Sequence, residues 1–240
     1  ILAAKGALRS GIGLLTIHLP FLNNAIVQTA VPEAMTEIDV HDTCFSAEVD
    51  TDDYQAVAIG PGLGQSRITE KALLDQLVIT TTPMVIDADA LNLLSANKNY
   101  LNKLPKGSIL TPHPKELERL VGKCNTSYER LQRACELSAK ANVHIVLKGA
   151  YTAIIQPSGE VCFNTTGNPG MATGGSGDVL TGILLALLAQ GYDADSAAKI
   201  GVYIHGLAGD EAAHQMGQIA MTASDIISYL PQAWKTIFGK

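Results

Sequence analysis

Short apolar segments alternate along this chain with longer segments in which apolar positions recur at the spacing of an α-helix. The apolar segments have the length and composition of strands that are buried on both faces. Strands are therefore predicted at residues 14–19, 56–59, 84–86, 108–110 and 144–147. Residues 151–156 and 161–164 flank the turn sequence PSGE, and this arrangement predicts a β-hairpin.

The segments between these strands predict helices. A helical period of apolar positions indicates helices at residues 1–9, 69–77, 127–141, 179–189, 195–216 and 222–238. Pro114 fits the first turn of a further helix, which follows the strand at 108–110. Residues 25–44 contain acids and show no clear period, so we expect this segment to be irregular.

Strands that alternate with helices are typical of α/β proteins, and here they predict a mostly parallel central sheet with helices on both faces. No change of composition divides the chain and no internal repeat is found, so residues 1–240 are expected to form a single domain. With 240 residues, 47% of them hydrophobic and 17% charged, the chain can bury a sizeable core.

Charge and composition argue against several classes of function. The net charge of −6 argues against a nucleic-acid partner. The longest apolar run, at 179–189, is too short to span a bilayer, so no membrane association is expected. Cys44, Cys124, Cys135 and Cys162 have no CxxC spacing, which indicates spare thiols in a reducing, cytoplasmic compartment.

The segment with the most candidate functional residues is 164–190, where a glycine-rich loop leads directly into an apolar helix. Five glycines in the loop would let a phosphate approach the free amides of the helix N-terminus. Asp178 stands at that N-terminus, where a carboxylate repels a phosphate. A proton acceptor beside the phosphate would explain it, and the alternative is a simple helix cap.

Other unusual sequences follow the predicted strands: GPGLG at 60–64, DADALN at 87–92, TPHPKE at 111–116 and KGAYT at 148–152. The carboxyl ends of parallel strands meet at one edge of a sheet, where ligands bind in such folds. We therefore expect these sequences and the GGSGD sequence at 174–178 to form a single active site. GxGxxG and GxxxxGK[ST] are absent, which argues against a Rossmann site and a Walker P-loop.

Each of these sequences also has a purely structural interpretation. GPGLG fits a tight turn, and Asp87 fits either a ligand or metal role or a plain strand end, while Asp89 fits a cap of the next helix. His113 lies between two prolines that fix its backbone, as a binding residue or a turn residue would. Lys148 fits a surface lysine whose stem alone is buried.

A second candidate cluster lies in the predicted helix at 195–216. It contains His205, Asp210, Glu211 and His214, but no HExxH spacing. We interpret this cluster as a solvated helix face and expect no metal-ligating residues in the chain.

Taken together, GPGLG, DADALN, LTPHPKE, VLKGAYT, NTTGNPGMATGGSGDVLTG and HGLAGD resemble, in this order, the ADP-dependent NAD(P)H-hydrate dehydratases. These proteins form the carbohydrate-kinase-like domain of the YjeF group within the ribokinase-like superfamily. The resemblance covers nearly the whole chain. It implies a three-layer ribokinase-like fold and the removal of water from hydrated NAD(P)H at the expense of ADP or ATP, with Mg²⁺.

The resemblance also implies roles for individual residues. Asp178 would be catalytic and would contact the substrate together with Gly62, Gly64 and His113. The adenine nucleotide would be held by Lys148, Gly149, Ala150, Tyr151, Thr152, Gly174, Gly175, Ser176 and Gly177. Phosphorylation would turn the hydrate hydroxyl into a good leaving group, which the ring nitrogen lone pair can expel. The protein would position the reactants, stabilise charge and remove a proton.

Members of this family begin with a strand and a glycine-rich turn before the helix that corresponds to residues 1–9. That first strand is expected to be missing here, and an N-terminal epimerase domain and a homotetramer are further family features that the sequence leaves open. Two alternative functions also stay open: a small-molecule kinase of the same superfamily, and a catalytically silent nucleotide-binding protein.

Overall fold

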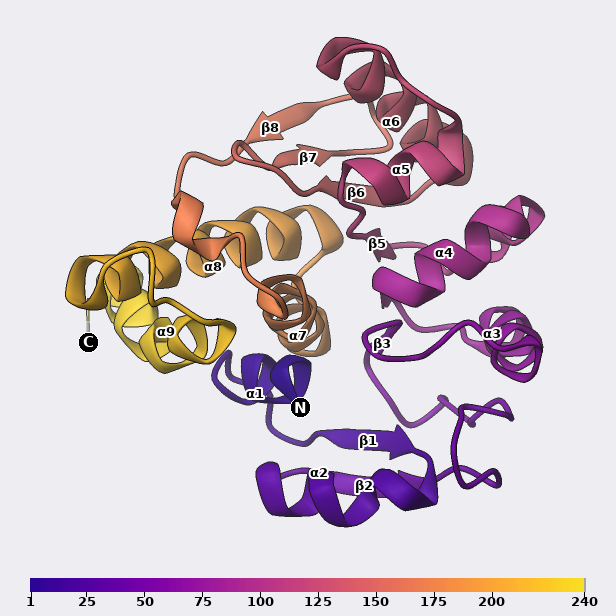
Figure 1. The fold of residues 1–240 in the computed structure, drawn as a ribbon. Coiled ribbons are helices and arrows are strands. Elements are labelled where there is room, and N and C mark those ends of the chain that lie inside the picture. Colours follow the sequence, from indigo (N-terminus) through magenta and orange to yellow (C-terminus); the bar gives the residue numbers. More distant parts are fainter. Residues whose placement is uncertain (240) are drawn as a thin grey trace.

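The computed structural model describes residues 1–239. Its main sheet runs in the order β3-β4-β5-β6-β7-β8, with β3 to β6 parallel and β7 and β8 antiparallel (Figure 1). The strands are β3 (Val57–Ile59), β4 (Met84–Ile86), β5 (Ile109–Leu110), β6 (His144–Leu147), β7 (Ala153–Ile155) and β8 (Val161–Phe163). The mostly parallel sheet and the terminal hairpin are as the sequence predicts.

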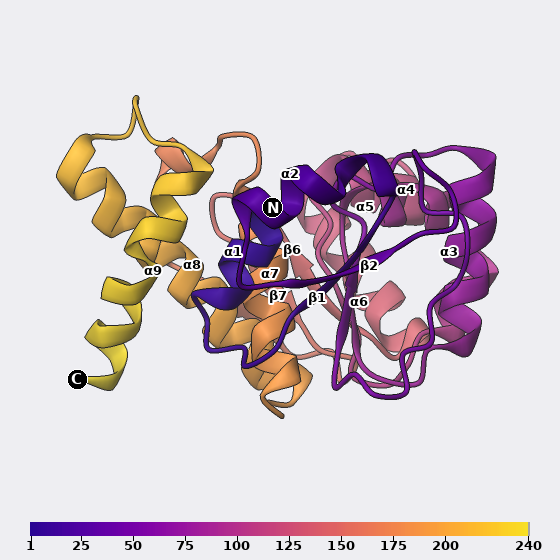
Figure 2. The same ribbon diagram turned by 90° about the horizontal axis from the view of Figure 1, so that it is seen from below.

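Helices cover both faces of this sheet, which gives the predicted three layers (Figure 2). One face packs against α3 (Arg67–Ile79), α4 (Ala88–Ala96), α5 (Pro114–Val121) and α6 (Ser127–Ala141). The other face packs against α7 (Ser176–Ala189), α8 (Ala194–Met216) and α9 (Ala223–Phe238). Short 3₁₀ turns lie at Phe21–Asn23, Lys98–Lys103 and Pro169–Met171.

The strands are unbroken apolar runs in the sequence because successive side chains point to opposite faces of the sheet, and both faces are covered. Ile86 and Leu110 point into the core under α3–α6, and their neighbours Val85 and Ile109 point into the core under α7–α9. Because successive side chains of a strand face opposite sides, a sheet covered on both faces needs apolar residues at every position.

The N-terminal part differs from the prediction. β1 (Thr16–Leu19) and β2 (Met35–Ile38) form a separate parallel pair, and α2 (Asn24–Ala30) lies between them in sequence. The prediction of an irregular 25–44 segment is therefore wrong. No residue of α2 or β2 is buried, so neither element shows the apolar period that a packed face requires.

The first helix, α1 (Leu2–Leu8), packs closely along α7. Glycines on both helices allow this approach, since a Cβ at Gly6 would lie 2.7 Å from the Val179 carbonyl oxygen, and one at Gly182 would overlap the Ala3 carbonyl. Through this contact α1 supports the helix that follows the glycine-rich loop. No helix within residues 1–239 is long and apolar enough to cross a membrane.

The α1–α7 contact gives a stability prediction. Gly182→Ala forces a methyl group against the α1 backbone, which places it 2.8 Å from the Ala7 amide nitrogen. We expect overpacking of this kind to lower the free energy of unfolding by about 1–3 kcal/mol, measured by urea denaturation. Gly13→Ala is the matched control, because no atom lies within 4 Å of the added methyl group. Equal stability of both variants would contradict a tight α1–α7 contact.

Candidate active site

The centre of the candidate site is the buried carboxylate of Asp87, which follows β4 directly and is only 1% exposed. Asp87 occupies the N-cap position of α4 but makes no capping hydrogen bond with its side chain. Instead, its Oδ1 accepts a 2.7 Å bond from Lys148 Nζ and its Oδ2 accepts a 2.8 Å bond from Thr181 Oγ1. One carboxylate therefore ties together β4, the end of β6 and α7.

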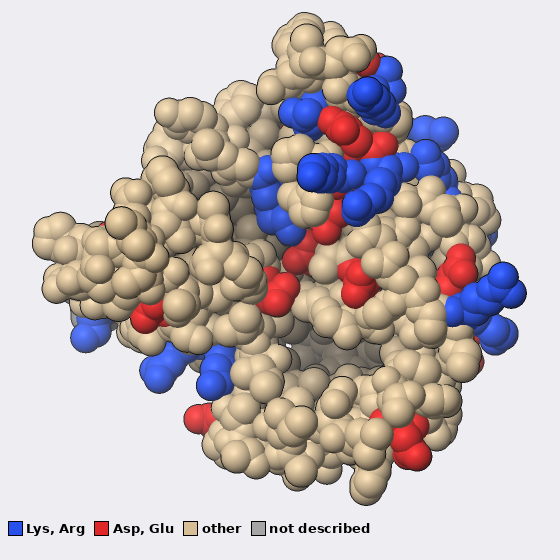
Figure 3. All heavy atoms as spheres, viewed as in Figure 1, with Lys and Arg blue, Asp and Glu red and all other residues tan. Residues whose placement is uncertain are grey.

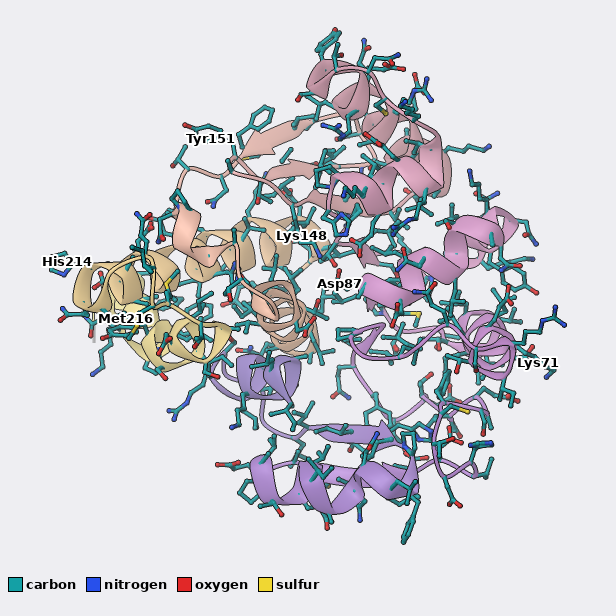
Figure 4. The ribbon with its side chains drawn as sticks, viewed as in Figure 1. Lys71, Asp87, Lys148, Tyr151, His214 and Met216 are labelled. Atoms are coloured by element: carbon teal, nitrogen blue, oxygen red, sulfur yellow. The ribbon has the colours of Figure 1, made fainter. Side chains whose placement is uncertain are left out.

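Lys148 follows β6 and directs its ammonium inward, so the interpretation as a surface lysine is wrong. Besides its bond to Asp87, Nζ lies 4.0 Å from Glu116 Oε2. Figure 4 shows Lys148 and Asp87 pointing toward one another from facing elements. Figure 3 shows basic and acidic side chains side by side around a hollow at the centre of this face. The ammonium is thus held between two carboxylates at the carboxyl edge of the sheet.

The glycine-rich loop enters α7 through Gly175, which is the N-cap residue and has a φ of 86°. That conformation favours glycine, and a Cβ there would also overlap the Leu2 side chain. Two residues on, a Cβ at Gly177 would lie 3.2 Å from Lys148 Nζ. The amide end of α7 and the Lys148 ammonium therefore adjoin, and both favour a bound anion.

Asp178 lies in the first turn of α7, three residues after the N-cap Gly175, so the alternative that it caps the helix is wrong. Its carboxyl group is half-buried. Burial and the Asp87 carboxylate raise the pKa of Asp178, while the Lys148 ammonium lowers it. A carboxylate with a raised pKa is a stronger proton acceptor than an ordinary aspartate.

Contacts from α8 shape the glycine-rich loop. Asp210 accepts a 2.8 Å bond from the Gly167 amide and a 2.9 Å bond from Asn168 Nδ2. His205 Nε2 lies 3.3 Å from Ser176 Oγ, and burial lowers the pKa of His205 to about 4, so its ring is neutral at pH 7. The interpretation of these two residues as a solvated face is wrong, because they support the loop. Within residues 1–239, no group of three or more metal-binding side chains is found.

The GPGLG loop is fixed against the start of α4. At Gly60 φ is 131°, and a Cβ there would overlap the carbonyl oxygen of Asp87. Asp89, which the sequence suggested as a helix cap, instead accepts a 2.9 Å bond from the Gly64 amide. A Cβ at Gly62 or Gly64 would meet no atom within 4 Å, so space beside these glycines is open.

His113 is the N-cap of α5. Its Nδ1 accepts bonds from the amides of Lys115 and Glu116, at 3.1 Å and 3.3 Å, while Glu116 Oε2 accepts a 2.8 Å bond from the His113 amide. This reciprocal capping box gives His113 and Glu116 a structural role at the start of α5. The imidazole is also 44% exposed at the edge of the site, so a substrate contact stays a prediction.

The predicted nucleotide residues beyond Lys148 form a turn. Thr152 Oγ1 donates a 3.2 Å bond to the Gly149 carbonyl, and Ala150 and Tyr151 are exposed. Tyr151, 72% exposed, lies away from Asp87 (Figure 4). The role of this turn in nucleotide binding stays a prediction, as does that of residues 174–177.

Two functional candidates were not assigned a role from the sequence. Thr181 is fully buried and donates to Asp87, and Glu116 approaches Lys148. The sequence does contain one sign of a role for Thr181, because it is a threonine within the apolar run at 179–189, one turn after Asp178. Its partner Asp87 lies 94 positions away in sequence, and no local pattern joins the two.

The three-layer α/β fold, with a glycine-rich loop and an acid at the start of α7, is that of a ribokinase-like protein. Within that class the assignment is specific. The family model described as NAD(P)H-hydrate dehydratase matches residues 1–232, and the chain belongs to this family.

Individual relatives agree with the family. The chain is 40% identical to a bifunctional NAD(P)H-hydrate repair enzyme Nnr of Moorella thermoacetica, over 98% of this chain and 46% of the relative. It is 34% identical to the ADP-dependent (S)-NAD(P)H-hydrate dehydratase of Bacillus subtilis, over 98% of this chain and 83% of that one.

A solved structure of a Bacillus subtilis ADP/ATP-dependent NAD(P)H-hydrate dehydratase, co-crystallised with ATP/Mg²⁺ and soaked with CoA, superimposes with a TM-score of 0.84. The match is 32% identical and covers 98% of this chain and 85% of that chain. By contrast, the chain spans about half the length of the bifunctional relatives.

The two roles of His113 can be separated by mutation. His113→Ala removes the capping acceptor and should lower the free energy of unfolding by ~1 kcal/mol. His113→Asn keeps a capping oxygen and should restore most of that stability. If the imidazole contacts substrate, His113→Asn should still raise KM for the hydrate while the Kd for ADP stays unchanged. Wild-type kinetics in a stable His113→Asn variant would leave His113 with the capping role alone.

Proposed function

We propose that this chain catalyses the ADP- or ATP-dependent dehydration of hydrated NAD(P)H to NAD(P)H. The observation that carries the proposal is the position of Asp178: a half-buried carboxylate with a raised pKa, in the first turn of α7, one residue after Gly177, whose position the Lys148 ammonium adjoins. Membership of the dehydratase family supports the same reaction. As a structural protein or plain binding module, the chain would have no use for a proton acceptor at an anion site.

The proposed reaction has two stages. Asp178 takes the proton of the hydrate hydroxyl, whose oxygen then attacks the terminal phosphorus of the nucleotide and displaces AMP or ADP. The carbon–oxygen bond to the new phosphate breaks as the ring nitrogen lone pair expels it, and loss of a proton from the adjacent ring carbon restores the double bond. The products are NAD(P)H, inorganic phosphate and the shorter nucleotide.

The proposal gives the surrounding residues distinct tasks. Backbone amides at 174–177 hold the transferring phosphoryl group, and the Lys148 ammonium stabilises its charge. The turn at 148–152 holds the rest of the nucleotide, while Gly62, Gly64 and His113 contact the hydrated cofactor. In this proposal Mg²⁺ is carried mainly by phosphate oxygens and water.

We also propose a domain organisation, an oligomeric state and a cellular compartment for the enzyme. Residues 1–240 act as one domain. The bifunctional relatives support fusion to an N-terminal epimerase domain. A homotetramer is the oligomeric state we propose, and the four free cysteines fit a reducing, cytoplasmic compartment.

Nucleotide binding can be tested without substrate. If 148–152 and the glycine-rich loop form one site, ADP should raise Tm, and saturation at ~100 times Kd should stabilise the fold by roughly 2.7 kcal/mol. Differential scanning fluorimetry with ADP, ATP and Mg²⁺ measures the shift, with circular dichroism to check folding. A folded protein with no shift at millimolar nucleotide would contradict the proposed site.

Asp178→Asn tests the proton acceptor. The variant keeps the shape of the side chain but loses the base and its negative charge. We expect it to fold normally and to bind ADP as well as the wild type or slightly better, because a repulsive charge is removed. The rate of NADH formation from hydrated NADH and ADP, followed by absorbance, should fall on the order of 10²-fold or more. Near wild-type turnover would refute the role of Asp178.

A further inference from the structure

Asp87 has no part in the proposed chemistry, although it is the most heavily engaged carboxylate of the site. It is 1% exposed, and both of its oxygens accept bonds, from Lys148 Nζ at 2.7 Å and from Thr181 Oγ1 at 2.8 Å. Its oxygens are therefore occupied by protein groups. The carboxylate would act on a substrate only through its neighbours.

We propose that Asp87 is a positioning residue for the dehydration: it holds the Lys148 ammonium against the first turn of α7 and faces Asp178 with a fixed negative charge. This inference rests on the proposed function. The anchor is rigid because Asp87 is bound from two directions, by the side chain that follows β6 and by a buried threonine of α7. A lysine without such an anchor has a flexible four-carbon stem and would sample many positions.

The place where the ammonium is held matters for the transferring phosphoryl group. A Cβ at Gly177 would lie 3.2 Å from Lys148 Nζ and 3.8 Å from Asp87 Oδ2, so both groups lie beside the Gly177 position in the first turn of α7. The other acid near Lys148 is Glu116, at 4.0 Å on the α5 side. Without Asp87, the ammonium would shift toward Glu116 and away from α7.

The same arrangement also shifts the pKa of Asp178, the proposed proton acceptor. Burial and Asp87 raise the pKa of Asp178, and Lys148 lowers it. His205 on α8 is neutral near pH 7 because burial lowers its pKa to about 4. Loss of the Asp87 charge removes a repulsive carboxylate and therefore lowers the pKa of Asp178.

Asp87→Asn is the direct test. At neutral pH we expect kcat to fall on the order of 10-fold to 100-fold, because the ammonium is displaced and the base is weaker. The acidic limb of the kcat profile and the ¹³C carboxylate titration of Asp178 should both move to lower pH. Asp39→Asn is the matched control: Asp39 is another buried, hydrogen-bonded carboxylate, in the β1–β2 part of the chain. It should lose stability and keep the wild-type pH profile.

Thr181→Val is a second test of the inference, and it leaves every charged group of the site in place. It removes one bond to Asp87, so kcat of the folded protein should fall and Thr181→Ser should restore it. If Asp87→Asn or Thr181→Val lowers stability while the kcat profile of the folded fraction stays as in wild type, Asp87 is a structural residue and the inference is wrong.

The Asp178 titration separates the two proposals, because it needs neither substrate nor turnover. A wild-type protein that is inactive on the hydrates, yet shows the titration shift in Asp87→Asn, would overturn the proposed function and leave the electrostatic coupling standing. An active wild type with an unchanged Asp178 titration in Asp87→Asn would overturn the inference alone.

Discussion

The buried ion pair between Asp87 and Lys148 is the interaction on which the site depends. Taking a carboxylate out of water is costly unless it is paired and hydrogen-bonded, and Asp87 meets that condition with Lys148 and Thr181. The partners come from the end of β6 and from α7, so the pair forms only when the sheet and its covering helix are assembled. Replacement of the pair by apolar groups could stabilise the fold equally well. Its presence therefore points to function.

The fold brings these charges together by simple rules. Parallel strands place their carboxyl ends at one edge, so β4 and β6 bring Asp87 and Lys148 to the same place. Helices on both faces keep the sheet dry, and glycines let backbones approach where a side chain would not fit. Gly60 lets the GPGLG loop lie against Asp87, and Gly182 lets α1 lie along α7. The site thus combines close backbone contacts with a few charges that are fixed by distant partners.

Much of this fold could be predicted from the sequence, because strands covered on both faces leave an unbroken apolar pattern. The parallel sheet, the hairpin and the long helices are examples. The segment at 25–44 could not, since α2 and β2 bury no residue and so carry no period. The site likewise has parts that the local sequence predicts and parts that it does not. Its loops were visible as glycine-rich strand ends, but the partners of Lys148 and Asp89 were not, because they lie 61 and 25 positions away.

The distance of these partners also bears on the chemistry of the glycine-rich loop. The loop places Asp178 in the first turn of α7, but the loop alone does not set the strength of this acid. Here that strength depends on burial, on a carboxylate after β4 and on an ammonium after β6. Each of these groups can change without altering the loop, because each belongs to a different strand end. The chemistry of Asp178 is therefore a property of the assembled sheet edge, and substitutions at 87 or 148 would alter it while the loop sequence stayed the same.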